Sequence, residues 1–140
     1  KIKIAIPFAG TILGGLLPGE MVLVQGSVPP GAHRFQVDFL CGSSVKPRAD
    51  VAFHFNPRFK RSPSVVCNSL QKERWGPEEV LHTGALRPGE TFELVVYLSL
   101  NIFNSILNEL KAKTRPLPPS LSLSLPPSPS LSLLLSLSLS

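Results

Sequence analysis

The segment from Ala52 to Phe59 alternates polar and aromatic side chains in a way that could build a binding surface. It reads AFHFNPRF, so His54, Asn56 and Arg58 fall on every second residue. Successive side chains of a β-strand point to opposite faces, so these three groups would form a row with about 7 Å between neighbours. Phe53, Phe55 and Phe59 would point the other way, toward a core. We therefore expect one buried face and one face that offers hydrogen bonds.

Two neighbouring segments show the same alternation and would widen this row into a polar floor. In RFQVDF, Arg34, Gln36 and Asp38 point one way, and the apolar residues between them point the other. In SVVCNSL, Asn68 lies on the polar face, whereas Val65 and Cys67 face the core. Side by side, the three segments would present amide, carboxylate, imidazole and guanidinium groups on one surface.

The lone tryptophan, Trp75, follows this floor in the segment QKERWGPEE, with Glu78 three residues later. An indole offers a flat apolar surface, and the polar floor beside it offers donors and acceptors. A pyranose needs both, because it has C–H groups on one face and hydroxyls around its rim. Galactose suits such a surface well, since its axial 4-hydroxyl leaves a C–H patch on the opposite side. The residues therefore favour a galactoside-binding surface.

The motifs HFNPRF, VVCN and WGPEE, in this order and spacing, resemble the β-galactoside-binding signature of the galectins, over residues 5 to 97. The resemblance implies that His54, Asn56 and Arg58 bind the galactose 4-hydroxyl and the adjoining sugar. It also implies that Asn68 and Glu78 bind the 6-hydroxyl and neighbouring groups. Trp75 would stack on the sugar ring.

A further basic and amide set resembles the pattern of those galectins that favour anionic galactosides. Arg34, Gln36 and Arg48 occupy the matching positions. The resemblance thus implies a preference for sialylated or sulfated galactosides. Without it, Arg34 and Arg48 would be interpreted as ordinary solvated charges.

Residues 1 to 97 have the pattern of an all-β domain. Short apolar or alternating runs are separated by Gly and Pro, and no helical periodicity is present, which favours a β-sandwich. The strongest predicted strands are residues 21–28, 34–39, 50–59, 64–70 and 91–98. The resemblance specifies a galectin-like jelly-roll β-sandwich, and a partial one, because the segment that supplies the family's C-terminal strands is not matched after residue 97.

The rest of the chain has a different character. Residues 98–114 carry apolar residues at helical spacing and predict a short helix outside the family domain. Residues 115–140 form a Pro/Ser/Leu low-complexity tail, which we expect to be disordered and to supply no replacement strand. Its Leu-Ser alternation is what a translated CT repeat would give, so we hypothesise translated non-coding sequence, with a genuine linker as the alternative. The prolines within it argue against a transmembrane helix, and no membrane insertion is expected.

Composition narrows the function further. The net charge is +5, but acidic residues lie among the basic ones, so no long cationic run favours nucleic acid as a partner. Cys41 and Cys67 match neither a metal-ligand pair nor a disulfide framework, which indicates free thiols and a reducing compartment of synthesis. The adjacent Glu78 and Glu79 do not by themselves present the facing carboxylates of a glycosidase.

The leading interpretation is a lectin that is not an enzyme, needs no cofactor or metal, and binds β-galactoside glycans of glycoproteins or glycolipids. An alternative is a truncated, poorly folded product without lectin activity, because missing strands would leave the inner faces of the sheet in water. A basic β-domain that binds nucleic acid is less favoured. The family resemblance implies a cytoplasmic protein with export that needs no signal peptide. The oligomeric state is not predicted.

Overall fold

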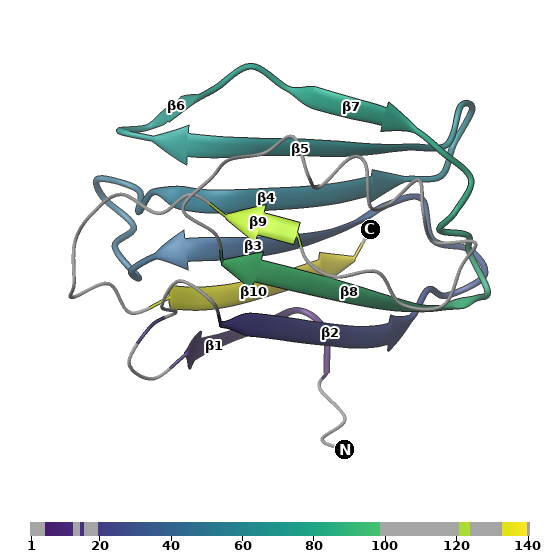
Figure 1. Ribbon diagram of the computed structural model, residues 1–140, viewed down its shortest axis with the longest axis horizontal. Helices are drawn as coiled ribbons and strands as arrows, with labels where there is room; N and C mark the ends of the chain where they lie inside the picture. Colours follow the sequence, from purple (N-terminus) through teal and green to yellow (C-terminus); the bar gives the residue numbers. More distant parts are fainter. Residues whose placement is uncertain (1–4, 13–14, 16–19, 99–120, 124–132, 140) are drawn as a thin grey trace.

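The computed structural model describes residues 5–12, 15, 20–98, 121–123 and 133–139, and the secondary structure within them is β-strand (Figure 1). The strands are β1 (Phe8–Ile12), β2 (Met21–Ser27), β3 (Phe35–Cys41), β4 (Val51–Arg58), β5 (Ser64–Gln71), β6 (Arg74–Trp75), β7 (Glu79–His82), β8 (Thr91–Leu98), β9 (Leu121–Leu123) and β10 (Leu133–Leu139). The described residues include no helix that could cross a membrane.

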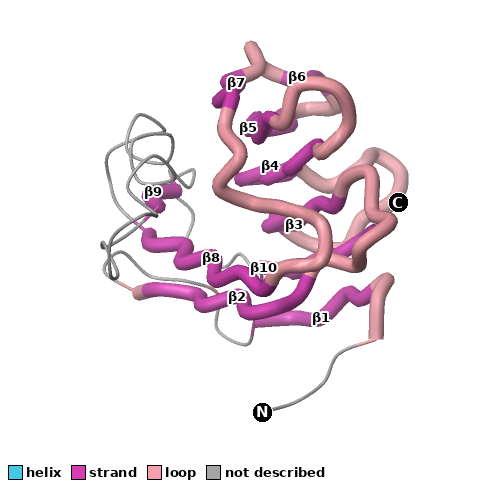
Figure 2. Tube along the Cα trace, turned by 90° about the vertical axis from the view of Figure 1, so that its right-hand side faces the viewer, coloured by secondary structure: helices cyan, strands magenta, loops and turns pink. Residues whose placement is uncertain are grey.

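The strands form two sheets. The larger sheet has the order β1-β10-β3-β4-β5-β6, with β7 also paired to β5, and the smaller has the order β2-β8-β9. Figure 2, the view from the side, shows β2 and β8 in a separate layer from β3, β4 and β5. The prediction of a β-sandwich is therefore confirmed.

The core lies between these layers and follows the alternation of the strands. Phe53 and Phe55 of β4 are 0% and 1% exposed, and they pack with the apolar residues of β3. From the smaller sheet, Leu94 and Val96 join the same cluster. The rings of Phe35 and Phe92 stack at 4.9 Å between centroids and so connect the two layers. Burial of each such large side chain contributes roughly 1.5 to 3 kcal/mol, which makes this face the main source of stability.

Cross-strand register places the polar residues of the larger sheet opposite one another. Asp38 lies opposite His54, which in turn lies opposite Asn68. Irregularities in both pairings of β4 lie just before His54, where one extra residue enters the strand. Such a bulge bends a strand and increases its local twist, here directly before His54.

The low-complexity tail supplies strands, so the expectation that it would supply none is wrong for β9 and β10. Strand β10 lies between β1 and β3 and pairs antiparallel with both, and β9 pairs parallel with β8. The physical reason is the Leu-Ser alternation, whose period of two matches the pleat of a strand. Register places Leu135 opposite Phe39 and Leu137 opposite Val37. The helix predicted within residues 98–114 lies outside the described residues, apart from Leu98, which ends β8.

Candidate functional site

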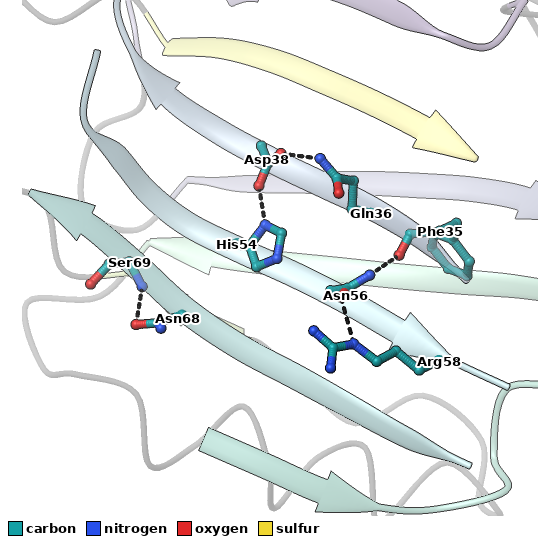
Figure 3. Close-up of polar contacts among 8 residues, drawn as sticks. All are labelled: Phe35, Gln36, Asp38, His54, Asn56, Arg58, Asn68 and Ser69. Carbon is teal, nitrogen blue, oxygen red and sulfur yellow. Dashed lines mark hydrogen bonds and ion pairs between the residues drawn. The ribbon is translucent and has the colours of Figure 1, made fainter. Parts of the chain in front are cut away.

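Six polar residues gather on the face of the larger sheet that is opposite the core (Figure 3). They come from three adjacent strands: Gln36 and Asp38 from β3, His54, Asn56 and Arg58 from β4, and Asn68 from β5. The alternation predicted from AFHFNPRF is confirmed, because Phe53 and Phe55, which alternate with His54 and Asn56, are buried in the core.

An aspartate that is nearly buried orients the histidine. Asp38 is 5% exposed, and its Oδ1 lies 2.5 Å from Nδ1 of His54. Its other oxygen accepts a hydrogen bond of 2.9 Å from Nε2 of Gln36. An ionised carboxylate can only accept, so Nδ1 of His54 must carry the proton. The remaining ring nitrogen, Nε2, then carries a lone pair in the neutral imidazole.

A second chain of hydrogen bonds fixes the other half of the row. Asn56 is 3% exposed and donates from Nδ2 to the carbonyl oxygen of Phe35 at 2.7 Å. Its Oδ1 accepts from Nε of Arg58 at 2.9 Å. Arg58 itself is exposed at the end of β4. The buried amide thus sets the direction in which the exposed guanidinium points.

Asn68 holds the hairpin that carries the tryptophan. Its Nδ2 donates to the carbonyl oxygen of Gly76 at 2.8 Å, and its Oδ1 accepts from the backbone N–H of Ser69 at 2.8 Å. A Cβ at Gly76 would lie 3.2 Å from Asn68 Oδ1, so a side chain there would force the amide to shift. Asn68 therefore positions the residue next to Trp75, while its amide keeps one further donor and one further acceptor site.

Trp75 is 45% exposed at one end of the polar row. Its ring centroid lies 5.1 Å from that of His54, with 58° between the planes. Cζ of Arg48 lies over the same ring, 5.5 Å from the indole centroid, within the range of a cation–π contact. A half-exposed indole near an imidazole and a guanidinium offers a flat apolar surface beside hydrogen-bonding groups.

The remaining predicted residues lie around this centre. Arg34 is exposed and forms an isolated β-bridge with Arg58, which places it at the same end of the sheet. Glu78 is exposed in the connection between β6 and β7. The structure thus places Gln36 within the polar row and Arg34 and Arg48 at its rim, but Glu78 is not joined to the row by a hydrogen bond within the described residues.

Sequence reasoning placed Asp38 on the polar face but did not recognise that it orients His54. The signal was present in the alternation of RFQVDF, whereas the partner depends on cross-strand register. Gly76, which leaves space for the Asn68 amide, was also missed.

The cysteines do not take part in this surface. Burial, followed by the nearby Glu79 charge, raises the pKa of the Cys67 thiol to about 12, so it stays protonated and inert at neutral pH. Among the described residues, no group of three or more His, Cys, Asp or Glu side chains could hold a metal ion. The face offers hydrogen-bonding groups, a guanidinium charge and a half-exposed indole.

Comparison with known proteins assigns this surface to a family. Residues 7–113 match the model of the galactoside-binding lectin family. The chain is 50% identical to rat galectin-8 over 103 residues and 53% identical to human galectin-12 over 94 residues. The chain therefore belongs to the galectins, the family of galactoside-binding lectins. The family match runs to residue 113, past the boundary at residue 97 that the motifs indicate.

Solved structures support the same fold. Sheep galectin-11 in complex with glycerol matches with a TM-score of 0.67 and 26% identity, over 99% of this chain and 96% of that one. A human galectin-16 variant matches with a TM-score of 0.67 and 23% identity, over 97% of this chain and 92% of that one.

The matched region of rat galectin-8 is 74% of this chain and 33% of that protein, and the human galectin-12 match is 66% of this chain and 28% of that protein. The chain thus spans about a third of the length of these curated relatives.

Proposed function

We propose that this chain binds β-galactosides through the outer face of β3, β4 and β5. The observation that carries the proposal is the exposed Trp75 at the end of a row of oriented hydrogen-bonding groups. His54 would accept from an axial hydroxyl through Nε2, and Arg58 would donate to the same hydroxyl and to the adjoining sugar. Because Asn56 is nearly buried, its role would be shared between the ligand and the orientation of Arg58.

The stacking platform completes this surface. The C–H face of galactose would lie on the indole of Trp75, at the end of the row where His54 is 5.1 Å away. Asn68 would use its remaining donor and acceptor sites, and Glu78 would close the surface from the loop beyond Trp75. A few exposed hydrogen bonds, at about 0.5 to 1.5 kcal/mol each, and one stacking contact give an affinity on the order of millimolar for a monosaccharide.

A preference for anionic galactosides follows from the cations at the rim. The guanidinium of Arg48 lies over Trp75, and Arg34 is paired with Arg58 through a backbone β-bridge. Both would lie within the surface that a longer glycan would cover. A charge-assisted hydrogen bond from such a guanidinium to sulfate or to a sialic acid carboxylate contributes roughly 1.5 to 3 kcal/mol when well formed. Gln36, held by Asp38, would add a neutral contact beside them.

The proposed activity is binding without catalysis, and it requires no metal or cofactor. The partners would be galactose-bearing glycans of glycoproteins or glycolipids. By analogy with the family, the chain would reside in the cytoplasm and reach such glycans after export without a signal peptide.

The proposal is tested by titrating lactose into the purified chain in a calorimeter, together with Trp75→Ala and Arg58→Ala. Both variants should lose detectable binding. The control is Arg87→Ala, which removes an exposed arginine whose Nε contacts the carbonyl oxygen of Gly84 outside the polar face. Strong lactose binding by the Trp75→Ala protein would contradict the proposal.

The anionic preference is tested separately with lactose and 3′-sialyllactose. The wild-type chain should bind the sialylated sugar more tightly, and Arg48→Ala should remove most of the difference. Equal affinity for both sugars would show that the arginines at the rim do not select anionic glycans.

A further inference from the structure

Arg48 is carried by a folded loop between β3 and β4. Within this loop, the backbone N–H of Ala49 donates to the carbonyl oxygen of Ser44 at 2.8 Å, and Val45 forms an isolated β-bridge with Arg48. The loop is therefore compact, but these internal bonds do not determine where it lies relative to Trp75.

The turn that precedes Trp75 has an unusual composition. Gln71 pairs with Arg74, so β5 and β6 are joined by the two-residue turn Lys72–Glu73. Both turn residues have positive φ, 49° and 63°. Two-residue hairpins with this backbone strongly favour Asn-Gly, because lysine and glutamate are strained in the left-handed region. Residues kept in such a conformation point to a role beyond closing the turn.

Two reciprocal hydrogen bonds join the loop to the turn. The backbone N–H of Arg48 donates to Oε1 of Glu73 at 3.1 Å, and the backbone N–H of Lys72 donates to Oδ1 of Asp50 at 2.9 Å. Each segment thus gives one N–H and one carboxylate to the other. We call this pair of bonds between Arg48 and Glu73 and between Lys72 and Asp50 the loop clamp.

The loop clamp connects the two sides of the cation–π contact. Glu73 lies two residues before Trp75, and Arg48, whose N–H it binds, has its guanidinium carbon 5.5 Å from the indole centroid. We propose that Asp50 and Glu73 are positioning residues, which hold Arg48 over Trp75 and thereby set the preference for anionic galactosides. This inference rests on the proposed function, and neither carboxylate is expected to touch the glycan.

Charge and position have opposite effects here, so suitable substitutions separate them. A carboxylate near an anionic ligand repels it, and removal of the charge alone should therefore strengthen anion binding. Glu73→Gln and Asp50→Asn remove the charge but keep an amide oxygen that can accept the same N–H. Glu73→Ala and Asp50→Ala remove both the charge and the acceptor. A positioning role predicts weaker anion binding only for the alanine variants.

The first experiment measures the ratio of affinities for 3′-sialyllactose and lactose by calorimetry. Glu73→Ala and Asp50→Ala should each lower this ratio by about 3- to 10-fold, with lactose affinity changed by less than about 2-fold. Glu73→Gln and Asp50→Asn should keep or raise it. In the Arg48→Ala background, the alanine substitutions should have no further effect. Glu93→Ala is the matched control, because Glu93 is an exposed carboxylate that accepts one hydrogen bond, from Gln25, in the smaller sheet.

The second experiment needs no sugar, because Trp75 is the single tryptophan of the chain. Its fluorescence quenching by acrylamide should increase when Arg48 no longer covers the ring. Glu73→Gly relieves backbone strain and should raise the melting temperature, but it removes the acceptor for the Arg48 N–H and should increase quenching. Lys72→Gly also relieves strain, but it keeps both bonds of the loop clamp and should leave quenching unchanged.

The two experiments distinguish an error in the proposed function from an error in the role of the loop clamp. If the wild-type chain binds no lactose, the proposed function is wrong, and quenching still decides whether the loop clamp positions Arg48. If the wild-type chain binds both sugars equally, the specificity part of the inference is wrong. If Glu73→Ala changes neither the affinity ratio nor the quenching, the inference is overturned.

Discussion

Substitution of Asp38 should weaken galactoside binding although Asp38 is not expected to contact the sugar. In the folded chain its two oxygens accept from Nδ1 of His54 and Nε2 of Gln36, and the residue is 5% exposed. Asp38→Ala removes both acceptors and lets the imidazole rotate or change tautomer. A hydrogen bond to a charged group contributes about 1.5 to 3 kcal/mol, which corresponds to roughly 10- to 150-fold in an equilibrium constant.

Only part of this lost free energy should appear as a loss of binding free energy, so lactose affinity should fall by about 10-fold in Asp38→Ala. Asp38→Asn keeps the shape but can offer an N–H to Nδ1, which would move the imidazole proton to Nε2. We expect a comparable loss for that variant, with a smaller change in melting temperature. Calorimetry with lactose and thermal melts of the same samples separate binding from stability. Unchanged lactose affinity in Asp38→Ala would refute the role assigned to this carboxylate.

Three further predictions concern stability. The pKa of Cys67 is about 12 in the folded chain, against 9.0 for an ordinary thiol. As pH rises, the thiol therefore loses its proton in the unfolded state first. The free energy of unfolding should then fall by up to about 4 kcal/mol between pH 9 and 12. Cys67→Ala should lack this pH-dependent part in denaturant titrations, and an identical slope in both proteins would contradict the burial of the thiol. A chain without residues 133–140 should lose more than about 5 kcal/mol of stability, because β10 pairs with β3 at seven positions and with β1 at five. A thermal melt like that of the intact chain would show that β10 is dispensable. Asn56→Ala should lower the free energy of unfolding by about 1 to 3 kcal/mol in chemical denaturation, since it removes the side chain that donates to the buried carbonyl of Phe35. The control is Ser62→Ala, at an exposed residue. A smaller loss for Asn56→Ala than for this control would count against the bond.

The strands of the sandwich could be predicted largely from local alternation. The segments 21–28, 50–59 and 91–98 became β2, β4 and β8 with ends that shift by at most one residue. Strand β6 has two residues and β7 has four, too short for an alternating pattern to show. The bulge before His54 was also invisible, because it depends on how β4 pairs with its two neighbours.

The candidate site could be predicted residue by residue but not as a network. The motifs pointed to His54, Asn56 and Asn68, whereas their hydrogen-bond partners are Asp38 and the backbone carbonyls of Phe35 and Gly76. These partners are 8 to 21 residues away in sequence, so only the fold brings them together.

The expectation that the tail would supply no strand is wrong for β9 and β10. Low complexity and absence of charge indicated a segment without a packing role, yet the same Leu-Ser alternation matches the strand position between β1 and β3. The composition showed only that the segment is of low complexity and uncharged, whereas the period of two in its Leu-Ser alternation allows it to pair as a strand.

The most direct test of the central claim is one calorimetric titration of lactose into the purified 140-residue chain, on a sample whose thermal melt is recorded in parallel. The lectin account predicts a cooperative melt and saturable binding at one site per chain, with no binding of sucrose, which lacks galactose. A chain that melts cooperatively but shows no heat with lactose would contradict the assignment of the polar face as a galactoside site. A chain without a cooperative melt would instead support the alternative of a product that does not fold and has no lectin activity.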